Sequence, residues 1–364
     1  MTERERFERL RLIRSPRIGP VSYRQLLARF GSAGEALRAI PMLAERGGGR
    51  ASVADAGAVE REIAATRAQG GRYLLMGDAD YPVLLDQMEG APPALIVRGD
   101  AALAARPCVA IVGARNASAA ACRFARSLAQ DLGQREAVVV SGLARGIDTE
   151  AHRGSIDSGT IGVIACGIDM VFPPENAGLQ EEVAQRGLLV TEHPPGTVPT
   201  AHHFPARNRL ISGLSSGVLV IEAALQSGSL ITARLALEQG REVFAVPGSP
   251  RDPRARGTND LLRQGAVLTE SAADVVEALR HQTVRPALRT ERPASPDPIE
   301  IEEDSEPDSV HDRVLSLLGP SPTGVDELVR ECQMSAASVH TALLELELAG
   351  RVERHPGNRV ALIA

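Results

Sequence analysis

The stretch Phe204–Arg234 holds the residues whose types and spacing point most clearly to chemistry. It begins with F-P-A-R-N-R, in which one aromatic ring precedes Arg207, Asn208 and Arg209. Its middle, G-V-L-V-I-E-A, is an apolar run with β-branched residues, which predicts a buried parallel strand. Beyond it, S-G-S-L-I-T-A-R offers hydroxyls at the start of a helix. Backbone amides and helix N-termini favour anions at the carboxyl ends of strands, so this composition indicates a phosphate-bearing polymer as the ligand.

Two earlier turns also follow predicted strands and combine small residues with an arginine. G-A-R-N-A-S follows the predicted strand Cys108–Gly113, and S-G-L-A-R-G-I-D follows the predicted strand Ala137–Gly142. Because parallel strands end at one edge of their sheet, three such turns predict a polyphosphate track there. The candidate DNA-contacting residues are Gly113, Arg115, Ser141, Gly142, Arg145, Gly146, Phe204, Arg207, Asn208, Arg209, Ser227, Gly228, Ser229, Thr232 and Arg234.

These signals have structural alternatives. Glycines after strands are common and usually serve the backbone. Phe204 either stacks a base, which is worth about 1–3 kcal/mol for any base, or plugs its loop into the core. Arg234, one turn into its predicted helix, fits an ordinary surface arginine better than a ligand contact.

The sequence does not predict a dinucleotide cofactor. The first turn lacks G-x-G-x-x-G, and the second strand ends in Ser141 rather than in an acidic residue for a ribose hydroxyl. The chain contains no lysine, so all 40 basic residues are arginines. A P-loop or Schiff-base lysine is therefore excluded, whereas bidentate phosphate contacts and stacking on bases are favoured.

Catalytic and metal-binding sets are also weak. Asp148 and His152 stand four apart on a predicted helix, but no third metal ligand follows from spacing, and Asp148 fits a helix cap better. A nucleotide hydrolase could use Glu192 with His202 and His203. No set of residues in the sequence forms a recognisable catalytic site. We therefore predict a protein that is not an enzyme and needs neither metal nor cofactor.

Charge and composition limit the protein class. The 364 residues carry a formal net charge of −6, so any polyanion site must be a local gathering of arginines. The four cysteines are scattered without C-x-x-C, the N-terminus is charged throughout, and no apolar stretch approaches the roughly 20 residues of a membrane helix. We therefore expect a cytoplasmic protein without membrane contact.

The elements that position these residues predict several domains. Residues 1–70 read as a SAM-like or helix-hairpin-helix domain. Residues 71–280 alternate strands and helices, which predicts an α/β fold with an extended Rossmann-like, doubly wound, mainly parallel sheet. Residues 281–309 are proline-rich and acidic and predict a disordered linker. Residues 310–364 read as a winged helix, whose third helix, Ser335–Leu348, carries acidic residues and no arginine, so packing or protein contact is favoured over DNA reading.

The ordered motifs resemble one family. I-V-G-A-R-N-A-S, S-G-L-A-R-G-I-D-T-E-A-H-R-G, C-G-I-D-M-V-F-P-P-E-N, H-H-F-P-A-R-N-R-L-I-S-G-L and V-I-E-A-A-L-Q-S-G-S-L-I-T-A-R closely resemble the DNA-processing protein A (DprA, or Smf) family across about residues 77–279. The resemblance implies a non-enzymatic, cytoplasmic, single-stranded DNA-binding protein of natural transformation. It further implies protection of incoming DNA, loading of RecA, and a homodimer formed through the Rossmann domains, near Leu261–Val267. Whether the two end domains bind duplex DNA or other competence proteins stays open.

The resemblance also carries residue roles and one departure. It places DNA contacts at Gly113, Arg115, Phe204, Arg207, Asn208, Arg209 and in S-G-S-L-I-T-A-R. Among these residues, we predict that Arg115, Arg207 and Arg209 neutralise phosphates. Members often have a lysine where this chain has Ala201, so that phosphate contact is lost or is supplied by His202 or an arginine. The alternative is a nucleotide-phosphoribohydrolase-like Rossmann enzyme, whose P-G-G-x-G-T-x-x-E motif is missing here.

Overall fold

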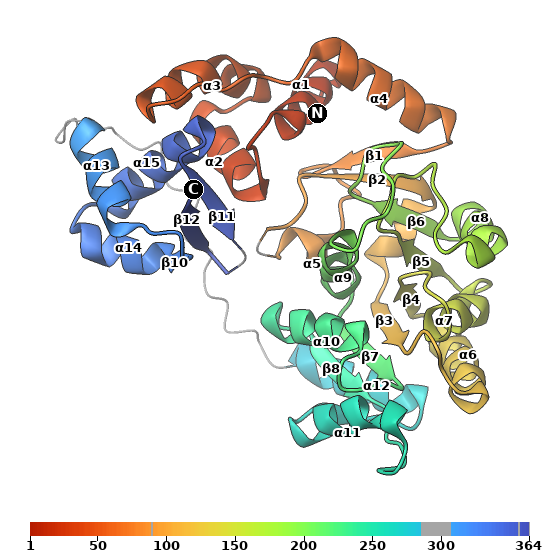
Figure 1. Ribbon diagram of the computed structural model, residues 1–364. Helices are drawn as coiled ribbons and strands as arrows, with labels where there is room; N and C mark the ends of the chain where they lie inside the picture. The colour runs from red at the N-terminus through yellow and green to blue at the C-terminus, as the bar shows by residue number, and fades with distance from the viewer. Residues whose placement is uncertain (89, 285–306, 356, 364) are drawn as a thin grey trace. The chain divides into compact units, whose positions relative to one another are not determined.

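The computed structural model describes residues 1–88, 90–284, 307–355 and 357–363 (Figure 1). These residues form two compact units. One contains Met1–Glu60 with the C-terminal helices and strands, and the other runs from Arg61 to helix α12 (Ala272–Val284). The predicted linker lies largely outside the described residues, but its ends are helical: α12 reaches Val284, and α13 (Pro307–Leu317) begins earlier than expected.

The second unit is built on one sheet, which within the described residues has nine strands in the order β1-β2-β6-β5-β4-β3-β7-β8-β9. Every neighbouring pair in this order from β6 to β9 is parallel, whereas β2 pairs antiparallel with both of its neighbours, β1 and β6. This confirms the predicted doubly wound, mainly parallel sheet. The strand bounds are β1 Arg72–Leu75, β2 Ala94–Gly99, β3 Cys108–Gly113, β4 Val138–Ser141, β5 Thr160–Val163, β6 Leu188–Thr191, β7 Gly217–Ile221, β8 Glu242–Ala245 and β9 Val267–Leu268.

Helices cover both faces of this sheet, because the strands are apolar on both sides. One face packs against α5 (Val83–Asp86), α9 (His203–Gly213), α10 (Gly228–Glu238) and α11 (Arg256–Arg263). The other packs against α6 (Ala119–Gln134), α7 (Ile147–Ser155) and α12. Helix α8 (Ala177–Arg186) joins a further cluster with β2 and β6.

The order of the strands creates a switch point. From β3 the chain moves outward through β4, β5 and β6, and then returns to place β7 on the other side of β3. At such a reversal the connections leave the two strands in opposite directions and open a crevice at their carboxyl ends. The turn after β3, the turn after β7 and the N-terminal end of α9, which leads into β7, all belong to this region (Figure 1).

The first unit combines the two ends of the chain. Its elements are α1 (Glu3–Arg14), α2 (Pro20–Phe30), α3 (Ala33–Arg46), the start of α4 (Ala56–Ala68), α13, α14 (Val325–Cys332), α15 (Ala336–Ala349), β10 (Thr323–Gly324), β11 (Val352–His355) and β12 (Arg359–Leu362). Three helices and a small sheet confirm the winged helix. Helix α15 packs on α3, and its Glu347 carboxylate accepts a 2.7 Å hydrogen bond from Ser22 Oγ. The two acidic residues Glu345 and Glu347 are buried in this unit.

In the part of the chain that the structure describes, every helix is too short or too polar to cross a bilayer.

Candidate nucleic-acid interface

Arg115 and Phe204 meet at the switch point. Arg115 is exposed on the turn after β3, and Phe204 is half-buried in the first turn of α9. The guanidinium carbon of Arg115 lies 5.5 Å from the centroid of the Phe204 ring, which is a cation–π distance. Arg115 forms no ion pair with any described residue. The sequence placed both residues in the site, and the structure brings them together.

The glycines of the first two turns serve the backbone. A Cβ on Gly113 would lie 1.9 Å from the carbonyl oxygen of Ile221, on the neighbouring strand β7. Gly146 has a φ of +75°, and a Cβ there would lie 2.3 Å from the carbonyl oxygen of Ala114. Because neither glycine has a side chain, the neighbouring backbone segments can pack closely against them. Backbone packing therefore explains why glycine stands at both positions.

The N-terminus of α6 is already occupied by a carboxylate. Glu222, which follows β7, accepts hydrogen bonds from the backbone amide of Ser118 at 2.8 Å and from its hydroxyl. This carboxylate takes the place that a phosphate would take at a helix N-terminus. Glu222 was missed by the sequence prediction. Its positive φ of 48° is a backbone feature that the sequence does not reveal.

The turn after β4 is closed in a similar way. Ser141 is fully buried and donates to the carbonyl of Ile111 at 2.6 Å. The amides of Gly142 and Ala144 donate to Asp148 at 3.1 and 3.3 Å. Burial raises the pKa of the Asp148 carboxyl, against the opposing effects of Arg207 and these amides. These internal hydrogen bonds argue against the predicted DNA contacts of Ser141 and Gly142. Asp148 fastens the turn instead.

Arg207 lies inside the protein rather than on its surface. Its side chain is only 6% exposed and donates to the carbonyls of Gly142 and Val163. Burial lowers its pKa to about 10, and the charge of Asp148 acts in the opposite direction. A guanidinium held inside the sheet edge cannot neutralise an external phosphate. Arg207 therefore holds the ends of β4 and β5 together, and its burial argues against the predicted phosphate contact.

The other arginines are partnered to different degrees. Arg209 is about three-quarters buried, forms an ion pair with Glu192 and donates to the carbonyl of Gly90 at 2.8 Å. Its predicted phosphate role is therefore also opposed by the structure. Arg145 and Arg234 are well exposed, in ion pairs with Glu175 and Glu238 respectively. The Arg234 pair is within one helix, which agrees with its interpretation as a surface arginine.

The turn after β7 contributes a partly accessible helix start. Ser227 caps α10 through its side chain, Gly228 is exposed, and Asn208 Nδ2 reaches the Gly228 carbonyl at 3.5 Å. Ser229 and Thr232 are buried, and Ser229 contacts the Ser227 hydroxyl at 2.7 Å. The expected DNA contacts of Ser229 and Thr232 are therefore not supported, whereas those of Ser227, Gly228 and Asn208 stay predictions.

A second aromatic ring lies beside Phe204. The ring centroids of Phe172 and Phe204 are 5.4 Å apart, with 52° between the ring planes. Phe172 follows β5, and its side chain is 41% exposed. It was absent from the predicted site, although it stands in the motif C-G-I-D-M-V-F-P-P-E-N and in a chain with 2% aromatic residues.

Three imidazoles stack next to this pair. His203 lies 4.3 Å from His193 and 4.3 Å from His202, measured between ring centroids. His202 and Ala201 are exposed at the start of α9. Among the described residues, no group of three or more His, Cys, Asp or Glu side chains is arranged to hold a metal ion.

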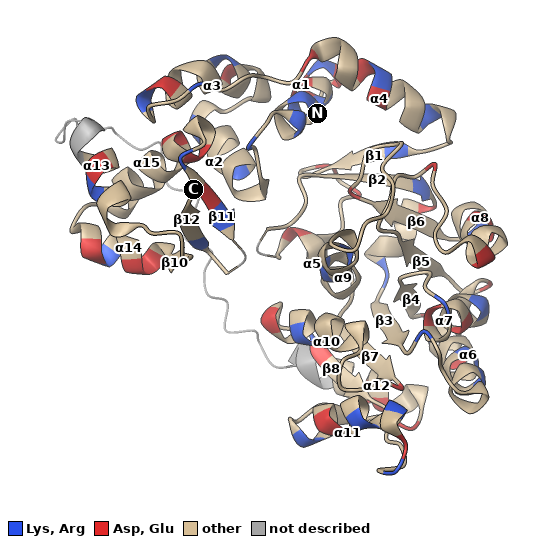
Figure 2. Ribbon diagram, viewed as in Figure 1, with Lys and Arg blue, Asp and Glu red and all other residues tan. Residues whose placement is uncertain are grey.

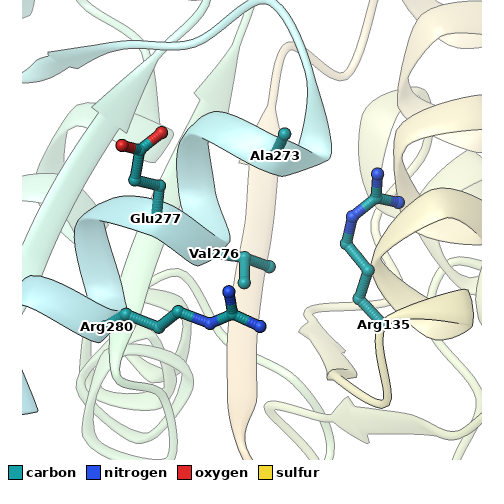
Figure 3. A pocket seen from close by; sticks show the side chains of 5 residues that line it. All are labelled: Arg135, Ala273, Val276, Glu277 and Arg280. Carbon is teal, nitrogen blue, oxygen red and sulfur yellow. The ribbon is translucent and has the colours of Figure 1, made fainter.

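A separate hollow of about 450 Å³ lies elsewhere on this unit (Figure 3). It is lined by Arg135, which follows the C-terminal end of α6, and by Ala273, Val276, Glu277 and Arg280 of α12. Because Arg115 precedes the N-terminal end of α6, the length of that helix separates the hollow from the switch point. Basic and acidic residues alternate along the exposed helices (Figure 2), so local geometry rather than overall charge marks the site.

Comparisons with known proteins agree on one family. Residues 72–280 match the family described as DNA recombination-mediator protein A. Residues 3–65 match the DprA-like N-terminal HHH domain, and residues 292–358 match the DprA winged helix domain. The DNA processing protein DprA of Bacillus subtilis is 44% identical over 62% of this chain and 77% of its own. Protein Smf of Escherichia coli is 38% identical over 81% of this chain and 78% of its own.

Solved structures agree. DNA processing protein A of Streptococcus pneumoniae matches with a TM-score of 0.58 and 40% identity, over 61% of this chain and 77% of that one. The Helicobacter pylori DNA processing protein A, described for its single-stranded DNA binding mode, matches with a TM-score of 0.53 and 32% identity, over 58% of this chain and 97% of that one. The chain therefore belongs to the DNA recombination-mediator protein A family, known as DprA or Smf.

Proposed function

We propose that this protein binds single-stranded DNA at the switch point between β3 and β7. The observation that carries the proposal is the exposed Arg115 guanidinium 5.5 Å from the Phe204 ring. A guanidinium can pair with a phosphate, and an aromatic ring can stack a base regardless of its identity. The two together suit an unpaired strand, whose bases are free to leave the stack, better than a duplex.

The site uses little charge, which fits a net-acidic protein. Arg207 and Arg209 are held internally, so Arg115 is the best-placed cation, with Arg145 available if its pair with Glu175 opens. We therefore expect a shallow salt dependence. Each phosphate neutralised on a single strand contributes a slope of about −0.7 in log K against log salt concentration.

Fluorescence anisotropy tests the proposal. Full-length protein is titrated with a labelled oligo(dT) and with the same length of duplex at several salt concentrations. We expect tighter binding to the single strand, with Arg115→Ala weakening affinity and lowering the salt slope. Equal affinity for the two forms, or no binding to the single strand, would overturn the proposal.

The finer roles rest on family membership. We propose a non-enzymatic, cytoplasmic protein that acts as a homodimer through its Rossmann domain and delivers single-stranded DNA to a RecA recombinase. The family's description as a recombination mediator supports the last step. Sedimentation of the full chain tests the dimer, and RecA filament formation on oligo(dT), with and without this protein, tests loading.

The hydrolase alternative has a weaker basis. Asp148 is held by backbone amides, and Glu192 is paired with Arg209, so these carboxylates are engaged in structural contacts. Incubation with nucleoside monophosphates, followed by chromatography for free base, separates the two functions. Release of base that is abolished by Glu192→Gln would favour the hydrolase.

A further inference from the structure

Phe172 is the most exposed of the six phenylalanines. All six lie in the described part of the chain, and Phe172 alone stands among the exposed large apolar side chains, at 41%. Single exposed apolar residues are ordinary on protein surfaces. Phe172 differs because its ring contacts Phe204, the proposed base-stacking residue, at 5.4 Å between centroids.

The segment that carries Phe172 is fastened on both sides. Upstream, the carbonyl of Met170 accepts a 2.7 Å hydrogen bond from Gln180 Nε2. Downstream, the buried Asn176 amide donates to the carbonyl of Leu143 at 2.8 Å. A ring displayed between two anchors needs little ordering when a ligand arrives, which favours affinity.

The two rings offer different surfaces. The Arg115 guanidinium lies over the Phe204 ring at 5.5 Å, so part of that ring is covered and Phe204 is only half-exposed. Phe172 has the larger free surface. Because the ring planes are tilted by 52°, a base lying flat on one ring cannot lie flat on the other.

We propose that Phe172 is a second base-stacking residue, and that Phe172 and Phe204 receive neighbouring bases of one unpaired strand. This inference rests on the proposed single-stranded DNA binding and deepens it. A tilted pair of rings holds the two bases out of mutual stacking, which a duplex cannot accommodate without opening. The pair therefore contributes selection for single strands as well as affinity.

The test compares binding to a strand that carries all its bases with binding to a strand that lacks its central bases. Full-length protein is titrated with labelled oligo(dT) and with an oligonucleotide of the same length whose central positions are abasic. Phe172→Ala should weaken oligo(dT) binding by roughly 5- to 150-fold, the range of one lost stacking contact. The same variant should bind the abasic strand like the wild type and keep the same salt slope.

Matched variants separate stacking from structure. Val171→Ala removes an equally exposed neighbour, also at 41%, and should leave affinity unchanged. Phe172→Trp should retain binding, whereas Phe172→Leu, which keeps apolar bulk without a ring, should not. Thermal melting of each variant confirms that it is folded.

The outcomes distinguish the two proposals. If the wild type binds oligo(dT) and Phe204→Ala weakens that binding, but Phe172→Ala binds oligo(dT) normally, the role of Phe172 alone is overturned. Equal loss on both strands, or full affinity in Phe172→Leu, also overturns it. If the wild type binds no single strand, the proposed function fails and this inference fails with it.

Discussion

The guanidinium carbon of Arg115 lies 5.5 Å from the centroid of the Phe204 ring, and this contact joins the turn after β3 to the start of α9. The two residues stand far apart in the sequence. They meet because the chain returns from β6 to place β7 beside β3. The topology of the sheet thus brings together a guanidinium, which we propose binds phosphate, and an aromatic ring, which we propose stacks a base.

Arg115→Ala should weaken single-stranded DNA binding equally for different base sequences. It should also lower the salt slope by roughly 0.7, because one phosphate contact is lost. Arg135→Ala removes the same charge from an exposed position at the other end of α6 and serves as the control. An Arg115→Ala protein with an unchanged slope would contradict this role.

Arg207→Met should lower the stability of the fold rather than remove a contact with DNA. It leaves the carbonyls of Gly142 and Val163 without their donor and the buried Asp148 without its nearby positive charge. We expect the free energy of unfolding to fall by about 3 kcal/mol, measured by denaturant titration. Arg234→Met, on an exposed helix, should change it by less than about 0.5 kcal/mol.

Salt titration of the Arg207→Met protein then separates structure from contact. We expect an unchanged slope, because this buried guanidinium is held by internal carbonyl groups. A slope reduced as much as in Arg115→Ala would mean that Arg207 does reach the DNA.

His152 should make the fold less stable in acid. Burial lowers its pKa to about 3, whereas an unfolded histidine titrates near pH 6.5. Between about pH 6.5 and pH 3, His152 binds a proton in the unfolded chain but stays neutral in the folded chain. The contribution of His152 to stability is therefore complete above about pH 6.5 and decreases as the pH falls toward 3.

Denaturant titrations at about pH 7.5 and about pH 5.5 measure this effect, with an expected loss on the order of 1 kcal/mol from this group. His152→Gln carries no titrating ring, so its stability should fall less between the two conditions. An equal fall in the variant and the wild type would assign the acid sensitivity to other groups.

Gly47→Val should disturb the contact between α3 and α15 in the first unit. A Cβ at Gly47 would lie 2.2 Å from the carbonyl oxygen of Glu345. We expect a loss of about 1–3 kcal/mol and faster amide hydrogen exchange in α15, with the core strands β3 and β7 unchanged. Gly319→Val, where a Cβ meets open space, is the control. Unaltered exchange in α15 would contradict the contact.

The fold could be predicted from local pattern because its strands are apolar runs bounded by glycine or polar turns. Cys108–Gly113 was predicted with the bounds that the structure gives, and Gly217–Ala223 was two residues too long. Helices α12 and α13 extend a few residues into the segment that the sequence predicted as a linker.

The site could be predicted only in part, because burial depends on helix phase and on distant partners. Arg207 shares one face of α9 with Leu210 and Ile211, and this spacing was the signal that it points inward. The partners of Arg209 and Ser118, namely Glu192 and Glu222, stand outside the motifs of those residues. Phe172 was missed because nothing local links it to Phe204.

Photochemical cross-linking tests the central claim most directly. Full-length protein is bound to oligo(dT) that carries 5-iodo-2′-deoxyuridine, irradiated, digested and mapped by mass spectrometry. We predict that the cross-linked peptides contain Phe204 or Phe172, at the carboxyl edge of the sheet beside Arg115. Cross-links confined to the winged helix or to the hollow around Arg135 and Arg280 would contradict it.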